Sequence, residues 1–143
     1  MLSISCKAAI KAVIYLGSKC ELEYKASVKE VSEFINENEH TVGKLLQKLA
    51  KEKIINSSKG PKGGFYISKV QRNLRVIEII QAIDGKDVFK QCGLGLSKCS
   101  ESRPCPFHND FKPVRELFKK MCQKKKISSL YENVNNGLAY LIG

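Results

Sequence analysis

The feature that most limits the fold of this chain is a pair of short amphipathic stretches followed directly by a glycine-rich basic turn. The first stretch opens with a capping box, because Ser27 is followed three residues later by Glu30. The second has apolar residues at i, i+3, i+4 and i+7 from Val42, after a polar turn that offers an asparagine cap. Residues 54–67 hold two β-prone segments around the turn. We therefore predict a helix-turn-helix joined to a β-hairpin, which is a winged-helix arrangement.

Four further segments complete the predicted architecture. Residues 4–17 and 75–83 carry the apolar pattern of helices, the first of them largely buried. A third helix has one apolar face over residues 107–122, and a last segment, 128–142, packs back on the core. The predicted fold class is mainly α with a small β wing: a winged helix-turn-helix plus a long C-terminal helix.

The composition is that of a globular protein with a large basic excess. Hydrophobic residues make up 43% of the 143 positions, and 25 Lys and Arg oppose 14 Asp and Glu, giving a net charge of +11. These values exclude wholesale disorder and point to nucleic acid or an anionic membrane surface as a partner. The longest apolar run, Ala12 to Leu16, is far below the roughly 20 residues that span a bilayer, and the N-terminus lacks the basic part of a secretory signal. We therefore expect a cytoplasmic protein without a membrane segment, in which thiols stay reduced.

The positive charge is concentrated on the second helix of the pair and on the wing. Residues 40–75 hold nine Lys and Arg and one acidic residue, whereas residues 21–39 have a net charge of −4. A solubilising charge would not be placed so selectively, but Lys and Arg at a duplex surface release condensed counterions. We predict that the second helix enters the major groove of double-stranded DNA and that the wing tip approaches the minor groove. The residues predicted to contact DNA are Asn38, Glu39, His40, Thr41, Lys44, Lys48, Lys59, Gly60 and Lys62.

Three cysteines and a histidine are grouped in a loop that has few apolar residues. Cys92, Cys99 and Cys105 are spaced C-x6-C-x5-C, and His108 follows as C-x2-H, all within a segment rich in Gly, Ser and Pro. Because such a loop has few apolar side chains that could pack and hold its conformation, we expect metal ligation to order it. Three thiolates and an imidazole suit zinc in a Cys₃His site or an iron–sulfur cluster. Free thiols or a redox disulfide are the alternatives, since the spacing matches neither paired C-x2-C units nor the ferredoxin pattern.

The remaining cysteines and the absence of catalytic patterns argue against an enzyme. Cys6, Cys20 and Cys122 lie in or beside predicted helices with apolar neighbours, which is typical of small core or boundary residues. The sequence has no C-x-x-C pair, no phosphate-binding loop and no paired carboxylates near His108. A nucleophilic Cys105–His108 pair would also need an orienting group that the sequence does not identify. We therefore predict a regulator rather than an enzyme or electron carrier.

The wing and the cysteine loop together resemble the Rrf-two family of bacterial winged-helix transcription regulators. The wing sequence from Ser58 to Phe65 is similar to the last eight positions of the family signature Ser-x-Arg-Gly-x-x-Gly-Gly-aromatic. The cysteine triad with His108 resembles most closely the family's iron–sulfur cluster regulator, and the nitric-oxide-sensing repressor is a relative. The sequence departs from the family in two places. The interval between the first two cysteines is one residue longer than in the cluster regulator. Lys59 also replaces the usual Arg, so the forked contact of a guanidinium is absent.

The resemblance implies a homodimer on a pseudo-palindromic operator. The helix from about Asp110 to Lys126 would pair with its mate, so that two recognition helices meet two half-sites. The expected parts are a winged helix-turn-helix DNA-binding domain (1–85), a cysteine-rich cluster-binding loop (86–106), and a dimerisation helix with a C-terminal segment (107–143).

The resemblance also implies an iron–sulfur cluster whose presence or oxidation state controls operator affinity. Cys92, Cys99 and Cys105 would be ligands, and His108 stands where the cluster regulator has a histidine, which favours [2Fe-2S] over [4Fe-4S]. The nitric-oxide sensor takes an acidic ligand from the first helix of its partner subunit, but the neighbourhood of Cys6 holds no carboxylate. The signal would be redox state, iron or nitric oxide. Structural zinc or a cysteine thiol switch is the alternative form of control.

Overall fold

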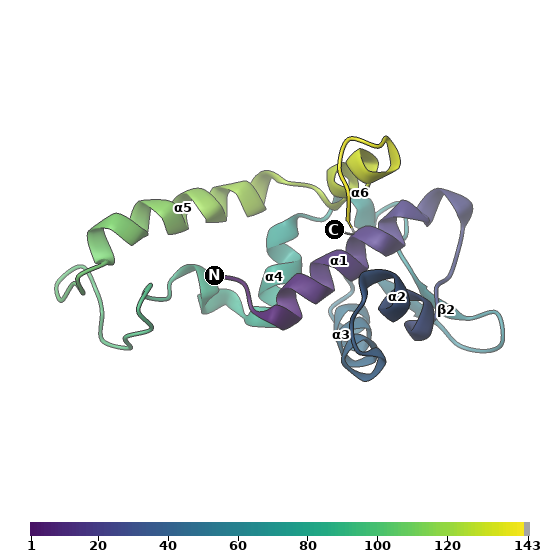
Figure 1. Cartoon of the computed structure of the whole chain (residues 1–143), viewed down its shortest axis with the longest axis horizontal. Coiled ribbons are helices and arrows are strands. Elements are labelled where there is room, and N and C mark those ends of the chain that lie inside the picture. Colours follow the sequence, from purple (N-terminus) through teal and green to yellow (C-terminus); the bar gives the residue numbers. More distant parts are fainter. Residues whose placement is uncertain (142–143) are drawn as a thin grey trace.

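The computed structural model describes residues 1–141, as a helical body from which a long helix and a hairpin project (Figure 1). The body contains α1 (Ile4–Ser18), α2 (Val28–Ile35), α3 (Glu39–Lys51), α4 (Val76–Asp84) and α6 (Ile127–Asn135). The hairpin pairs β1 (Asn56–Ser58) with β2 (Gly64–Tyr66), and the projecting helix is α5 (His108–Lys124). Short 3₁₀ turns form at η1 (Cys20–Leu22), η2 (Gln71–Asn73) and η3 (Lys86–Phe89). Among the described residues, no helix combines the length and the apolar character that a membrane crossing requires.

Helix α1 is the centre of the core and packs against α2, α3, α4 and α6. It is capped by Ser3, whose hydroxyl accepts a hydrogen bond from the backbone N–H of Cys6 at 3.0 Å. Its contact with α6 depends on Gly17, because a Cβ there would lie 2.2 Å from the Tyr131 ring. The buried residues of α1 are Cys6, Ala8, Ala9, Ala12, Val13, Tyr15, Leu16 and Gly17. The predicted buried helix is therefore confirmed, with its end one residue later.

Helices α2 and α3 form the predicted helix-turn-helix, and local caps set both of its ends. The Ser27 hydroxyl accepts from the backbone N–H of Glu30 at 3.1 Å, as the capping box predicts. Helix α2 ends at Ile35 and is followed by the capping residue Asn36, which adopts a left-handed conformation (φ 55°). The Asn38 side chain then caps α3 by accepting from the Thr41 N–H at 3.2 Å. The apolar faces meet in one core made of Val31, Ile35, Val42, Leu46 and Leu49.

The hairpin is anchored at its base by backbone and side-chain hydrogen bonds. In the antiparallel register Ser57 lies opposite Phe65. Phe65 also exchanges backbone hydrogen bonds of 2.9 and 2.8 Å with Ala26, so the segment before α2 continues the small sheet. The buried side chain of Gln71 exchanges two 3.0 Å hydrogen bonds with that of Asn56. The wing is thereby fixed to the helix-turn-helix.

Three details differ from the sequence prediction. The first strand is shorter than predicted because Ile54 and Ile55 turn into the core, where they are 4% and 1% exposed. The helix predicted over residues 107–122 begins one residue later and ends two residues later, as α5 (His108–Lys124). Helix α6 ends at Asn135, and the end of the predicted 128–142 segment lies outside the described residues.

Candidate DNA-binding surface and metal centre

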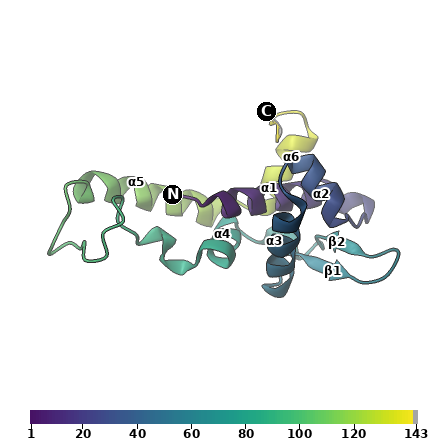
Figure 2. The ribbon, with the colours of Figure 1, turned by 60° about the horizontal axis from the view of Figure 1, so that its bottom comes forward.

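Helix α3 and the wing, which is the β1–β2 hairpin, lie on the same side of the molecule, opposite α6 (Figure 2). Every residue that the sequence predicts to contact DNA is solvent-exposed: Asn38, Glu39, His40, Thr41, Lys44, Lys48, Lys59, Gly60 and Lys62. Two of them also have local roles. The side-chain oxygen of Asn38 caps α3. The Lys48 ammonium donates to the backbone oxygen of Ile83 in α4 at 3.4 Å. This surface unites an exposed helix face with a cationic turn, as groove recognition needs.

One exposed residue of this surface escaped the sequence prediction. Gln47 lies three residues after Lys44 and seven after His40, so all three share one exposed face of α3. The helical spacing alone could have identified it. A glutamine in this position can hydrogen-bond an adenine edge in the major groove.

Two glycines of the wing allow a turn that no other residue fits. A Cβ on Gly63 would lie 2.1 Å from the carbonyl oxygen of Ser58, and one on Gly64 would lie 2.7 Å from that of Ala26. The Gly63 N–H donates to Gly60 O at 2.9 Å and closes the turn. The basic tip therefore depends on glycine for its shape.

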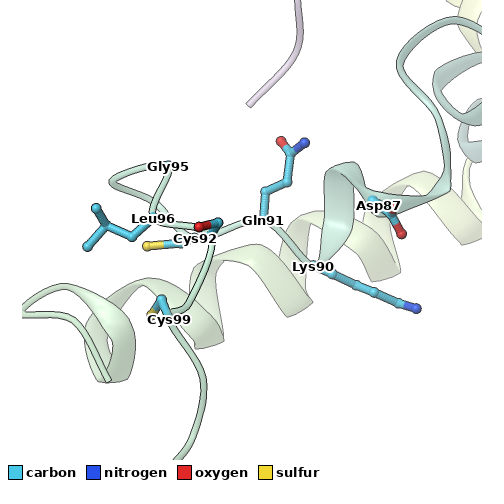
Figure 3. A pocket seen from close by; sticks show the side chains of 8 residues that line it. Asp87, Lys90, Gln91, Cys92, Gly95, Leu96 and Cys99 are labelled. Atoms are coloured by element: carbon cyan, nitrogen blue, oxygen red, sulfur yellow. The ribbon is translucent and has the colours of Figure 1, made fainter. Parts of the chain in front are cut away.

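The cysteine loop lies at the other end of the long axis from the wing (Figure 1). The sulfurs of Cys92, Cys99 and Cys105 lie within 4.8 Å of one another, and those of Cys92 and Cys105 are 3.4 Å apart. The Nδ1 of His108 is 3.3 Å from the Cys99 sulfur. Cys92 and Cys99 also line a cavity of about 450 Å³ that η3 borders through Asp87 (Figure 3). The structure thus brings the sulfurs of the three predicted cysteine ligands together, and it places the fourth predicted ligand, His108, beside Cys99.

Comparison with known proteins identifies the family. The family model described as "Rrf2: Iron-dependent Transcriptional regulator" matches residues 2–133. The chain belongs to the Rrf2 family. It is therefore a transcriptional regulator and not an enzyme, as the sequence predicts, and membership of this family implies DNA binding.

Individual relatives agree with this assignment. The HTH-type transcriptional regulator NsrR of Oceanobacillus iheyensis is 22% identical over 134 residues, which cover 93% of this chain and 90% of the relative. The structure of CymR, the global cysteine regulator of B. subtilis, has a TM-score of 0.72 at 17% identity and covers 92% and 96% of the two chains. That of T. potens IscR has a TM-score of 0.72 at 16% identity, with coverages of 98% and 92%. The two structures show that the winged-helix fold is shared.

The local environment of this Rrf2-family loop favours thiolate at one cysteine. Backbone hydrogen bonds from Leu96 and Leu94 lower the pKa of the Cys92 thiol to about 7. Desolvation raises the pKa of Cys105, and its hydrogen bond with Cys92 raises it further. Of this close pair, Cys92 is therefore the thiol that ionises more readily. The thiols also lie beside the N-terminus of α5, where the helix dipole favours anions.

The donor set fits a thiophilic metal ion or cluster. A tetrahedral ion with metal–sulfur bonds of about 2.3 Å holds its sulfurs about 3.8 Å apart, which is close to the spacing of these thiols. Thiolate with imidazole is the ligand chemistry of zinc and iron–sulfur sites. The buried Nε2 of His108 also has no hydrogen-bond partner among residues 1–141.

The other three cysteines are separate from this centre, as the sequence predicts. Cys6 and Cys122 are 0% and 1% exposed where α1, α4 and α5 meet. Burial raises the pKa of Cys6 to about 12 and also raises that of Cys122. Cys20 is half-buried, with its sulfur 3.6 Å from the Tyr131 hydroxyl. The two buried thiols are small core residues with little nucleophilic character.

Proposed function

We propose that this chain is a homodimeric DNA-binding regulator whose operator affinity is controlled by an iron–sulfur cluster. The observation that carries the proposal is that the sulfurs of Cys92, Cys99 and Cys105 lie within 4.8 Å of one another, with His108 beside Cys99. The loop that holds these cysteines follows α4, and α4 packs on α3. The description of the family as iron-dependent agrees with iron as the metal. When bound, the cluster supplies a centre that responds to redox state, iron supply or nitric oxide.

The pairing of the donors favours [2Fe-2S] over [4Fe-4S]. The two closest contacts join Cys92 to Cys105 at 3.4 Å and Cys99 to His108 at 3.3 Å. A two-iron cluster takes two protein ligands on each iron, so four donors in two pairs suit it. A histidine among the ligands also raises the reduction potential of such a cluster, as a redox sensor requires.

A continuous set of contacts links the loop to the recognition helix. The loop begins with η3, whose Phe89 is buried and lies 5.8 Å, ring to ring, from Phe118 of α5. Helix α4 precedes η3 and receives the Lys48 hydrogen bond at its Ile83 carbonyl oxygen. A change in the order of the loop would therefore shift α4 and, through it, the exposed face of α3. This two-state coupling is the proposed route from cluster to DNA.

The exposed apolar face of α5 supports a homodimer. Val114, Leu117 and Met121 are 52%, 70% and 54% exposed and repeat at helical spacing, and Ile4 of α1 is 80% exposed. A symmetric pairing of such faces covers them and sets two recognition helices at the spacing of pseudo-palindromic half-sites. The proposed parts remain a DNA-binding domain (1–85), the loop (86–106) and the dimerisation helix with its C-terminal segment (107–143). We place the protein in the cytoplasm, where the operator lies.

Anaerobic purification tests the proposal most directly. We expect charge-transfer bands in the visible spectrum, with about two irons and two acid-labile sulfides per chain for [2Fe-2S]. Four of each would indicate the larger cluster. Zinc without sulfide, or no metal, would contradict cluster control while leaving the DNA-binding assignment intact.

A thiol switch is the second candidate, and one distance favours it. The 3.4 Å between the sulfurs of Cys92 and Cys105 needs to shorten only to about 2.05 Å to form a disulfide. Mass spectrometry of the metal-free protein after mild oxidation by a peroxide would detect a loss of two hydrogens in the peptide pair that joins these cysteines. Structural zinc is excluded if the metal analysis finds none.

The wing lysine should contribute a phosphate contact. We expect Lys59→Ala to weaken operator binding several-fold and to reduce the slope of log K against log salt by about one, because one counterion fewer is released. Fluorescence anisotropy at several salt concentrations measures both quantities. Lys119→Ala on α5 removes the same charge away from the α3–wing surface and should leave the slope unchanged. An unaltered slope for Lys59→Ala would remove this residue from the DNA-binding surface.

A further inference from the structure

Arg115 of α5 holds the backbone that leads into the first candidate ligand. Its Nη1 donates to the carbonyl oxygens of Gln91 at 2.8 Å and Lys90 at 3.2 Å. These are the two residues directly before Cys92. One guanidinium thus fixes the direction in which the chain enters the centre, a task for which its planar, multi-donor shape is suited.

Helix α5 also supports the other side of Cys92. Gly93 packs so closely on the ring of Phe111 that a Cβ at this glycine would lie 3.0 Å from a ring atom. The same ring lies 6.0 Å from the guanidinium carbon of Arg115, within the range of a cation–π contact. Cys92 is therefore positioned by side chains of α5 on both flanks, although it belongs to a loop without regular structure.

One donor of Arg115 has no acceptor. Its Nε–H is buried and, within residues 1–141, has no hydrogen-bond partner. Arg115 lines a cavity of about 190 Å³ together with Cys92, Cys99 and His108. A buried charged donor is unfavourable unless an acceptor faces it, and anionic sulfur is such an acceptor. A metal–thiolate centre in this cavity would provide such an acceptor for the Nε–H.

We propose that Arg115 is a positioning residue for the metal centre. It clamps the backbone before Cys92 through two carbonyl groups and offers its Nε–H to the anionic sulfur of the centre. The proposal rests on the metal centre of the proposed function and adds a residue outside the ligand set. Residues that orient ligands in this way typically change metal affinity 10- to 100-fold when removed.

The test compares Arg115→Ala, Arg115→Lys and, as a matched control, Lys119→Ala one turn further along α5. Each reduced, metal-free protein is titrated with Zn²⁺ against a chromophoric chelator, and iron and sulfide are measured after reconstitution. We expect Arg115→Ala to raise the apparent zinc dissociation constant 10- to 100-fold and to lower cluster occupancy. Arg115→Lys keeps the positive charge and can still donate to backbone carbonyls, but it has no Nε–H to offer to the centre, so it should recover part of the affinity. Lys119→Ala should behave as the unmodified protein.

A second measurement does not depend on metal. Without the clamp, the metal-free loop should expose Cys92, so Arg115→Ala should react several-fold faster with an aromatic disulfide reagent than the unmodified chain. Circular dichroism verifies that the variant is folded. Normal zinc affinity together with a normal thiol reaction rate would overturn the role of Arg115. If the unmodified protein binds no metal but Arg115→Ala still reacts faster, the clamp is supported and the metal centre of the proposed function is what fails.

Discussion

Replacing Cys99 with alanine is expected to remove the metal centre completely while the winged-helix body stays folded. The Cys99 sulfur is 3.3 Å from the His108 Nδ1 and accepts the backbone N–H of Cys105 at 3.4 Å. Its loss leaves two thiols and an imidazole, which cannot complete a tetrahedral or two-iron ligand set. Because Cys99 belongs to neither hydrophobic core cluster, the thermal unfolding of the body should change little.

Iron, sulfide and zinc per chain, with the visible spectrum, measure this outcome under anaerobic conditions. The matched control is Cys20→Ala, which removes a half-buried thiol that contacts Tyr131 rather than the loop. The control should retain full metal content. Operator affinity of Cys99→Ala should no longer respond to the reagents that destroy the cluster in the unmodified protein. A wild-type spectrum in Cys99→Ala would place the centre on other residues.

The parts of the fold that local chemistry determines could be predicted from the sequence. Capping residues and helical apolar repeats act within a few positions, so α1, the Ser27 cap of α2 and the Asn38 cap of α3 appear where these signals predict them. The wing is also encoded locally, since only glycine tolerates the close approach at Gly63. The family assignment confirms the class of protein that these local features indicated.

What the sequence could not predict depends on contacts between distant residues. Arg115 reaches Gln91 across 24 positions, and Gly93 meets Phe111 only because α5 turns back along the loop. Nothing in the spacing of the cysteines reveals these supports. Ile54 and Ile55 have strong β-propensity, yet burial against the helices overrides it and shortens the first strand. The ligand set and the DNA contacts remain predictions, now with a geometry to test.

The wing should lose its function when Gly63 is replaced by alanine. The new Cβ would lie 2.1 Å from the Ser58 carbonyl oxygen and 2.8 Å from the carbonyl carbon of Lys59, and backbone atoms cannot rotate away as a side chain would. The turn must open, which displaces Lys59 and Lys62 together. We expect operator affinity to fall about tenfold or more and the salt slope to decrease by about two, one unit for each lost phosphate contact.

The same substitution at Gly43 of α3 provides the control. A Cβ there would make an ordinary 3.4 Å contact with Val28, and alanine favours a helix interior by about 0.5–1 kcal/mol over glycine. Gly43→Ala should therefore keep its operator affinity and unfold at the same or a higher temperature. Gly63→Ala should unfold within a few degrees of the unmodified chain, because the wing lies outside the main core. Full affinity and an unchanged salt slope in a folded Gly63→Ala would mean that α3 binds the operator without the wing.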